Sequence, residues 1–173
     1  MGGGLAKVRI VSSWGAIGLR REGKRLLRAL VATGVEIVYG NFQSQARWMR
    51  RETACETPDC PSGGEKERVI YREEKGSDVN LGAHLLMDAF RAGCELAVVV
   101  TNDTDLLEPI RMARRELGVR TMLIAPNPKP AARLIAEVDW VRHLRHGALR
   151  AAQLPLTLRD HKGEMHRPRD WRP

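Results

Sequence analysis

The chain has 173 residues, of which 43% are hydrophobic, 5% aromatic and 29% charged, and its formal net charge is +8. This length predicts one domain that buries about two-thirds of its unfolded surface. No apolar run approaches the roughly 20 residues of a membrane-spanning helix, and three cysteines are too few for a disulfide framework, so we expect a cytoplasmic protein without membrane contact.

The first half of the chain alternates strand-like and helical patterns. Apolar residues recur at helical spacing up to Ala32, and Gly34 is a fitting stop for that helix. The segment that follows residue 51 is polar and rich in helix and strand breakers, which is typical of a loop. We therefore expect strands at residues 8–12, 35–39 and 68–72, a helix at 20–32 and a loop at 52–66.

The second half continues this alternation. Ser77 or Asp78 is expected to cap a helix that ends at Gly93, and the run from Asp105 to Glu108 resembles a capping box. Pro109 is acceptable because it falls in the first helical turn. The expected elements are helices at 79–93, 106–118 and 130–137 and strands at 97–101, 120–125 and 138–141.

This order of elements predicts a three-layer α/β/α fold with a mainly parallel sheet. One domain is expected at residues 1–152. Residues 153–173 are polar, basic and contain proline, so they are expected to form an irregular C-terminal arm.

The segment Ala97–Leu106 is the most informative part of the chain. Four apolar residues in a row predict a strand buried on both faces, and Asn102, Asp103 and Asp105 follow directly. In open α/β sheets, ligands bind beyond the carboxyl ends of the strands. Paired carboxylates at such a place suit an oxygen-ligated cation, usually Mg²⁺ or Mn²⁺.

Asp78 is a third candidate, at the start of the preceding helix. Each of the three acids taken alone is better explained as a turn or capping residue. If both helices start on the same side of one parallel sheet, however, the three carboxylates converge. Like charges raise one another's pKa, and a bound cation would remove that conflict.

The segment from Glu73 to about Pro126 resembles the NYN domain, the LabA-like branch of the PIN-like nucleases. The resemblance is carried by Lys-Gly-Ser-Asp-Val at residues 75–79 and by Val-Val-Val-Thr-Asn-Asp-Thr-Asp-Leu at residues 98–106. It extends more loosely to residues 35–42, 153–155 and 168–171.

The resemblance implies a PIN-like fold and a bacterial-type ribonuclease that uses Mg²⁺ or Mn²⁺. Asp78, Asp103 and Asp105 would be the catalytic and metal-binding residues, and water activated by the cation would attack the phosphodiester. Asn102 and Lys75 would contact the substrate, which would be single-stranded or structured RNA. A solvated Lys75 without such a role is the alternative.

One departure from the family pattern opens a second reading. Family members begin with a strand that ends in Asp, whereas residues 1–19 contain neither Asp nor Glu. The chain is therefore expected to lack the family's first strand. The alternative function is a catalytically impaired NYN-fold module that binds RNA without cutting it. A phosphotransferase or phosphatase ranks lower, because the Asp-x-Asp belongs to a late strand and no glycine-rich phosphate loop is present.

Charge and the remaining side chains give weaker signals. Residues 1–51 carry a net charge of +8, residues 52–132 carry −4 and residues 133–173 carry +4. This distribution suits a metal-dependent enzyme that acts on a polyanion, and it equally suits an ordinary solvated basic surface.

Cys55 and Cys60 could be half of a zinc knuckle, although four ligands are usual. The basic residues of the first helix are either phosphate contacts or its solvated side. Tryptophans, Trp48 among them, could stack on unpaired bases, while Trp140 is expected in the core.

Overall fold

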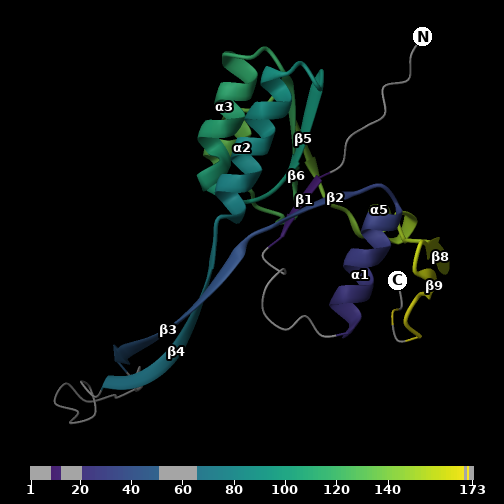
Figure 1. Ribbon diagram of the computed structural model, residues 1–173. Coiled ribbons are helices and arrows are strands. Elements are labelled where there is room, and N and C mark those ends of the chain that lie inside the picture. The colour runs from purple at the N-terminus through teal and green to yellow at the C-terminus, as the bar shows by residue number, and fades with distance from the viewer. Residues whose placement is uncertain (1–8, 13–20, 51–65, 170, 172–173) are drawn as a thin grey trace.

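The computed structural model describes residues 9–12, 21–50, 66–169 and 171, and it is an α/β protein with a parallel sheet (Figure 1). The elements in chain order are β1 (Arg9–Ser12), α1 (Arg21–Ala32), β2 (Glu36–Tyr39), β3 (Asn41–Arg50), β4 (Lys66–Lys75), α2 (Ser77–Phe90), β5 (Leu96–Val100), η2 (Thr104–Leu106), α3 (Leu107–Arg115), β6 (Arg120–Ala125), α4 (Ala132–Ala136), β7 (Trp140–His143), α5 (His146–Ala151), β8 (Thr157–Asp160) and β9 (Gly163–His166). None of the helices in these residues has the length and apolar character that crossing a bilayer requires.

The first unit is a parallel strand pair joined through a helix, as expected. β1 pairs with β2 in parallel register from Arg9↔Glu36 to Ser12↔Tyr39, and α1 lies between them in the chain. Gly34 ends the helix with a positive φ of 86°, a conformation that glycine adopts without strain. The predicted strand, helix and strand are therefore confirmed within one or two residues.

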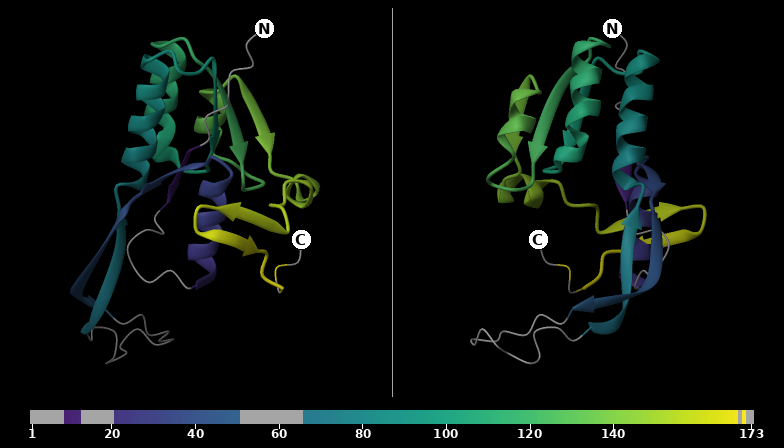
Figure 2. Two further views of the ribbon diagram at one scale, coloured as in Figure 1. Left: turned by 45° about the vertical axis from the view of Figure 1, so that its right-hand side comes forward. Right: turned by 90° about the vertical axis from the view of Figure 1, so that its left-hand side faces the viewer.

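A long antiparallel ribbon follows, and the sequence did not predict it. β3 and β4 pair over ten residues each, from Asn41↔Lys75 to Arg50↔Lys66. The ribbon extends away from the rest of the protein in every view (Figures 1 and 2). The predicted strand at 68–72 was too short and its partner was missed, because the described side chains of the ribbon join no core cluster and leave no alternation of buried and exposed residues. The loop predicted at 52–66 lies almost wholly outside the described residues.

The parallel sheet β5–β6–β7 carries the main core. β5 pairs with β6 and β6 with β7, all in parallel. The buried cluster combines strand and helix residues: Val99, Leu106, Ile110, Leu123 and Leu134, with Leu81 and Leu85 of α2 packed against it. A second cluster joins Ala89, Ala97, Ala113 and Val119. Strands alternating with helices α3 and α4 are the arrangement that the sequence pattern predicted.

The sheet is buried on one face among the described residues, not on both as predicted. Ala97 and Val99 are 8% and 7% exposed, whereas Val98 and Val100 are 49% and 56% exposed. Trp140 pairs in register with Met122, on the same face as Val98, and is 44% exposed, so its predicted place in the core was wrong. Helices cover the face of the sheet that carries Ala97 and Val99. The described residues therefore show the sheet and one layer of helices of the expected three-layer fold.

Helices α2 and α3 pack side by side, and a glycine permits their close approach (Figures 1 and 2). Gly82 is buried, and a Cβ added there would lie 2.8 Å from Cγ of Pro109. A larger side chain would push the helices apart, because protein interiors leave no spare volume at such contacts. Gly82 follows Asp78 by one helical turn, so this contact also fixes where the first turns of the two helices lie.

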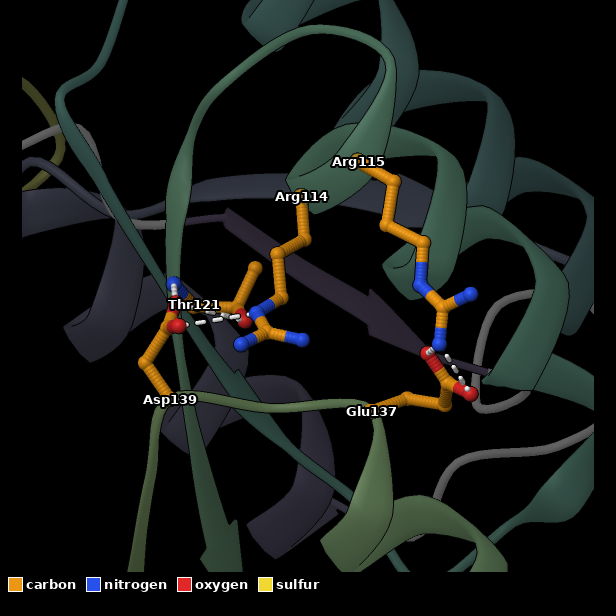
Figure 3. Close-up of polar contacts among 5 residues, drawn as sticks. All are labelled: Arg114, Arg115, Thr121, Glu137 and Asp139. Carbon is orange, nitrogen blue, oxygen red and sulfur yellow. Dashed lines mark hydrogen bonds and ion pairs between the residues drawn. The ribbon is translucent and has the colours of Figure 1, made fainter.

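Two ion-paired links tie the end of α3 to the connection between α4 and β7 (Figure 3). The Arg114 Nε donates to Asp139 Oδ1 at 2.8 Å, and Arg115 Nη2 donates to both carboxylate oxygens of Glu137 at 2.8 and 2.9 Å. The Thr121 amide donates to Asp139 Oδ2 at 2.8 Å. That amide, followed by Arg114, holds the pKa of Asp139 below its usual range. Both arginines lie in the last turn of α3, where positive charge also offsets the negative helix end.

The C-terminal segment is ordered, contrary to the predicted irregular arm. β8 and β9 form an antiparallel hairpin from Thr157↔His166 to Asp160↔Gly163, and the short helix α5 precedes it. The Arg28 Nε of α1 donates to Asp160 Oδ2 at 2.7 Å, its Nη2 donates to Asp160 Oδ1, and the same Nη2 reaches the Gly163 carbonyl at 3.1 Å. Arg28 is therefore a structural link between α1 and the hairpin and not a solvated residue of a basic helix face. Its hydrogen bonds hold the pKa of Asp160 far below the usual range.

Candidate metal centre

Three acidic side chains meet where α2 begins and β5 ends. One carboxylate oxygen from each of Asp78, Asp103 and Asp105 lies within 4.8 Å of the others. Asp78 belongs to the first turn of α2, Asp103 is the N-cap of η2, and Asp105 lies within η2. The two segments are separated by a helix and a strand in sequence, so the tertiary structure brings the acids together as the pattern predicted.

Asp78 is available to this cluster because another residue caps its helix. The N-cap position is Gly76, whose φ of 90° is a left-handed conformation, and no side chain bonds there. The Glu74 carboxylate instead accepts from the Ser77 amide at 3.0 Å and from the Ser77 hydroxyl at 2.5 Å. The prediction that Ser77 or Asp78 caps α2 was wrong, so the carboxylate of Asp78 does not occupy the N-cap position.

Gly40 makes this cap possible. Gly40 is buried between β2 and β3, and a Cβ at this position would collide with the Glu74 carboxylate and the Ser77 hydroxyl. Any larger residue would therefore displace the group that satisfies the first amide of α2. The sequence signal was present, since Gly40 follows a strand directly, but neither Gly40 nor Glu74 was identified as part of the site.

Asp103 has a clear local role as well as its place in the cluster. Its backbone is extended, and its Oδ1 accepts from the Asp105 amide at 3.0 Å, which makes Asp103 the cap of η2. Its own amide donates to Thr101 Oγ1 at 2.9 Å. The capping box predicted at Asp105 was thus misplaced by two residues. Asp105 has no hydrogen-bond or ion-pair partner for its carboxylate among the described residues.

The crowding of negative charge has an electrostatic consequence at Asp78. The pKa of Asp78 is raised, first because its carboxyl loses part of its hydration and then because Asp103, Glu74 and Asp105 are negatively charged neighbours. The side chain remains exposed on the whole. Helix N-termini favour nearby anions, which offsets part of this repulsion at the starts of α2 and η2.

Asn102 contributes an unpaired oxygen beside the triad. It stands between Thr101 and Asp103, and its Oδ1 is buried without a hydrogen-bond partner among the described residues. Buried polar oxygens are nearly always paired with protein, water or an ion, so the partner of this oxygen is a group other than the described residues. An amide oxygen is an accepted ligand of hard cations.

The donor set fits a divalent cation. Oxygens bound to one Mg²⁺ at about 2.0–2.1 Å cannot be more than about 4.2 Å apart. The 4.8 Å limit on the three carboxylates is within about 0.6 Å of that value, a difference that side-chain rotation can close. Oxygen-only donors select Mg²⁺, Mn²⁺ or Ca²⁺ over zinc.

Other predicted site residues are placed elsewhere or fall outside the described residues. Lys75 donates to Glu73 Oε1 at 2.7 Å, on the opposite face of the ribbon from Glu74. Its ammonium is therefore neutralised by Glu73 and is not directed to the triad. Cys55 and Cys60 lie outside the described residues. Cys94 packs against the second core cluster, and burial raises the pKa of its thiol.

Comparison with known proteins gives one sequence relative. No family model matches the chain. A stretch of 104 residues is 36% identical to 6-hydroxy-3-succinoylpyridine 3-monooxygenase HspA from Pseudomonas putida. The match covers 57% of this chain and 33% of that protein, so the chain spans about one third of the length of its relative.

Comparison of structures gives one similar fold. A crystal structure of a protein of unknown function from Vibrio parahaemolyticus superposes with a TM-score of 0.52 and 11% sequence identity. The superposition covers 81% of this chain and 69% of that chain. At this identity the likeness concerns the fold alone, and it supports an α/β architecture with a parallel sheet.

Proposed function

We propose that this protein is a metal-dependent ribonuclease whose cation is held by Asp78, Asp103 and Asp105. The observation that carries the proposal is the convergence of three carboxylates within 4.8 Å, with the helix-capping role of Asp78 taken over by Glu74. Uncompensated carboxylates at this separation repel one another, and a divalent cation converts that repulsion into binding.

Each residue has a distinct part in the proposed site. Asp103 is held in one orientation by its bond to the Asp105 amide, so its second oxygen is positioned before any ligand arrives. Asp78 and Asp105 supply the remaining charge, and Asn102 Oδ1 supplies a neutral oxygen. A bound Mg²⁺ or Mn²⁺ would polarise the scissile phosphate and activate water as the nucleophile. Such a site needs no Ser, Cys or His nucleophile.

The family assignment and the finer fold belong to the same proposal. The NYN resemblance and the three-layer PIN-like fold are supported by the acids at the end of β5 and the start of α2, and by the parallel order of β5, β6 and β7. An experimental structure that defines what covers Val98 and Val100 would test the three-layer arrangement.

The experiment is cleavage of a 5′-labelled single-stranded RNA in Mg²⁺ or Mn²⁺, with EDTA as the blank. We expect metal-dependent products from the unmodified chain and a loss of at least about 100-fold in Asp103→Asn and Asp105→Asn. Asparagine at 103 keeps an oxygen for the η2 cap, so folding is preserved. Glu95→Gln, at the far end of β5, is the control and should cut normally. Binding of RNA without cleavage in either metal would instead support the catalytically impaired RNA-binding module.

The sequence relative suggests a second candidate, hydroxylation of a pyridine compound. It is favoured by the 36% identity over 104 residues, although that activity belongs to a protein about three times the length of the matched stretch. Incubation with 6-hydroxy-3-succinoylpyridine, O₂ and a reduced nicotinamide as the two-electron donor, followed by chromatography of the products, tests it. Turnover of that compound together with no RNA cleavage would replace the nuclease proposal.

A further inference from the structure

The β3–β4 ribbon has two faces with opposite chemical character. Residues paired across an antiparallel ribbon share a face, and the faces alternate along each strand. We call one the paired face; its members are Asn41, Gln43, Gln45, Arg47, Met49, Glu67, Val69, Tyr71, Glu73 and Lys75. We call the other the cationic face; its described side chains are Ser44, Ala46, Trp48, Lys66, Arg68, Ile70, Arg72 and Glu74.

The charges of the paired face are neutralised within the ribbon. Glu73 accepts from Lys75 at 2.7 Å and lies 3.8 Å from the Arg47 guanidinium. Arg47 also stacks over the ring of Tyr71, with 4.9 Å from its Cζ to the ring centroid. The hydrogen bond from Lys75 lowers the pKa of Glu73, so this carboxylate stays ionised. Little free charge remains on this side to attract a partner.

The cationic face is both charged and apolar, and it is open to solvent. Lys66, Arg68 and Arg72 are exposed and have no ion pair or hydrogen bond from their side chains to any described residue. Between them, Trp48 is 66% exposed and Ile70 is 74% exposed. Trp48 stands directly opposite Arg68 in the register. A two-stranded ribbon is marginally stable alone, and exposed large apolar side chains on it indicate an interaction surface.

We propose that the cationic face binds single-stranded RNA, with a base stacked on Trp48 and phosphates held by Lys66, Arg68 and Arg72. This deepens the proposed nuclease and rests on it for the choice of RNA. Interleaved aromatic and cationic side chains are the arrangement that binds single strands without sequence preference. A second copy of the chain is disfavoured as the occupant, because apposed cationic faces would bring like charges together.

The same face leads toward the acidic triad. Its last member is Glu74, which bonds to Ser77 at the start of α2 and whose charge contributes to the raised pKa of Asp78. The face therefore runs from Lys66 at the far end of the described ribbon to the candidate metal centre. Eight residues of strand span about 26 Å, enough to guide several nucleotides. The ribbon would act as an arm that delivers a strand to the triad.

The test is fluorescence anisotropy of a fluorescein-labelled 12-nucleotide single-stranded RNA, titrated with the full chain in EDTA so that no metal-dependent cleavage occurs. We expect Trp48→Ala to weaken binding by about 5- to 100-fold. Met49→Ala, a neighbouring exposed residue on the paired face, is the matched control and should leave binding unchanged. Circular dichroism of each variant verifies that the fold is retained.

The charge contribution is tested by the salt dependence of the same titration. Arg68→Gln with Arg72→Gln should flatten the slope of log K against log salt by about 1.4, since each lost phosphate contact removes about 0.7. The control is Arg91→Gln with Arg133→Gln, which removes equal charge from exposed arginines outside the ribbon and should leave the slope within about 0.3 of that of the unmodified chain.

The outcomes separate this proposal from the nuclease proposal. RNA cleavage with unchanged binding in Trp48→Ala would overturn the role of the ribbon and leave the nuclease standing. Binding that depends on Trp48 without any cleavage would uphold the ribbon and overturn the nuclease. If Trp48→Ala converts a dimer to a monomer in sedimentation and leaves RNA binding unchanged, the face is a self-association surface and the proposal is wrong.

Discussion

Replacing Asp78 by Asn should make the metal-free protein more stable. The carboxylate of Asp78 lies within 4.8 Å of one oxygen each of Asp103 and Asp105, and its pKa is raised by lost hydration and by these neighbours. Asparagine has nearly the same shape and no charge. The substitution therefore removes repulsion with little effect on packing.

The size of the gain follows from Coulomb's law. Two unit charges 4.8 Å apart repel by about 0.9 kcal/mol in the dielectric of water. Screening over a Debye length of about 10 Å at 0.1 M salt reduces this to about 0.5 kcal/mol per pair. Two pairs involving Asp78 give about 1 kcal/mol, which corresponds to a rise of about 2–4 °C in Tm for a protein of this size.

The assay is thermal unfolding followed by circular dichroism in EDTA at pH 7, with Glu95→Gln as the control. The Glu95 side chain is 95% exposed and stands at the opposite end of β5, and its surface ion pair with Arg120, at 3.7 Å, contributes little to stability. Its neutralisation therefore removes the same charge far from the triad. We expect a higher Tm for Asp78→Asn and no comparable change for Glu95→Gln. Mn²⁺ should reverse the order, because it would stabilise the unmodified chain by about 2.7 kcal/mol at 100 times its Kd.

The pH dependence supplies the refutation. A raised pKa means that the folded protein holds the Asp78 proton more tightly than the unfolded chain, so lowering the pH into the carboxylate range favours folding at this residue. The advantage of Asp78→Asn should therefore shrink as the pH falls from 7 to about 3. If Asp78→Asn is no more stable at pH 7, or keeps its full advantage at pH 3, the repulsion argument is wrong.

Three further substitutions test the surrounding structure. Gly82→Val should lower the free energy of unfolding by about 1–3 kcal/mol, because the valine side chain would clash with Pro109 and separate α2 from α3. The same variant should bind Mn²⁺ more weakly in calorimetry. Unchanged Mn²⁺ affinity would mean that this contact does not position the acids. Leu134→Ala, in a fully buried position, should cost about 2–5 kcal/mol in urea unfolding, and a cost below about 1 kcal/mol would show that α4 is not part of the core. Asp160→Asn should lower Tm at pH 7 by breaking the link to Arg28. Because the native pKa of Asp160 lies far below that of the unfolded chain, the difference should begin to shrink as the pH falls below about 4 and should continue to shrink at lower pH. A difference at pH 3 that equals the difference at pH 7 would contradict this origin.

The sequence predicted the elements whose burial is periodic. The helix that ends near Ala32 carries an apolar repeat, and its Leu27 is buried. The strand around Val99 and the strand from Arg120 to Ala125 carry apolar runs, and one face of each strand packs against the core. The order of these elements indicated a parallel sheet. The positions of Asp103 and Asp105 at a strand end followed from that order alone.

The features that the sequence missed are those without such a repeat. The ribbon strands β3 and β4 pack on no core, so their composition shows no alternation to detect. The C-terminal hairpin was hidden by its polar composition, and it is tied to α1 by the Arg28–Asp160 ion pair across 132 residues. No local pattern records a partner at that distance in sequence.

The helix starts depended on contacts that helix propensities do not record. Glu74 caps α2 only because Gly40, from a different strand, leaves room for its carboxylate. Asp103 caps η2 because the chain turns two residues earlier than the capping-box pattern suggested. Competing carboxylates near a helix start can each fill the role, and the tertiary structure selects among them.

The sequence by itself determined which residues carry charge and which elements they begin or end. Only the tertiary structure decided that Asp78 meets Asp103 and Asp105, since this depends on the close approach of α2 and α3 at Gly82 and Pro109. Periodicity along one segment reports burial of that segment, whereas the distance between two segments depends on how their side chains pack. The acidic cluster is a property of that packing.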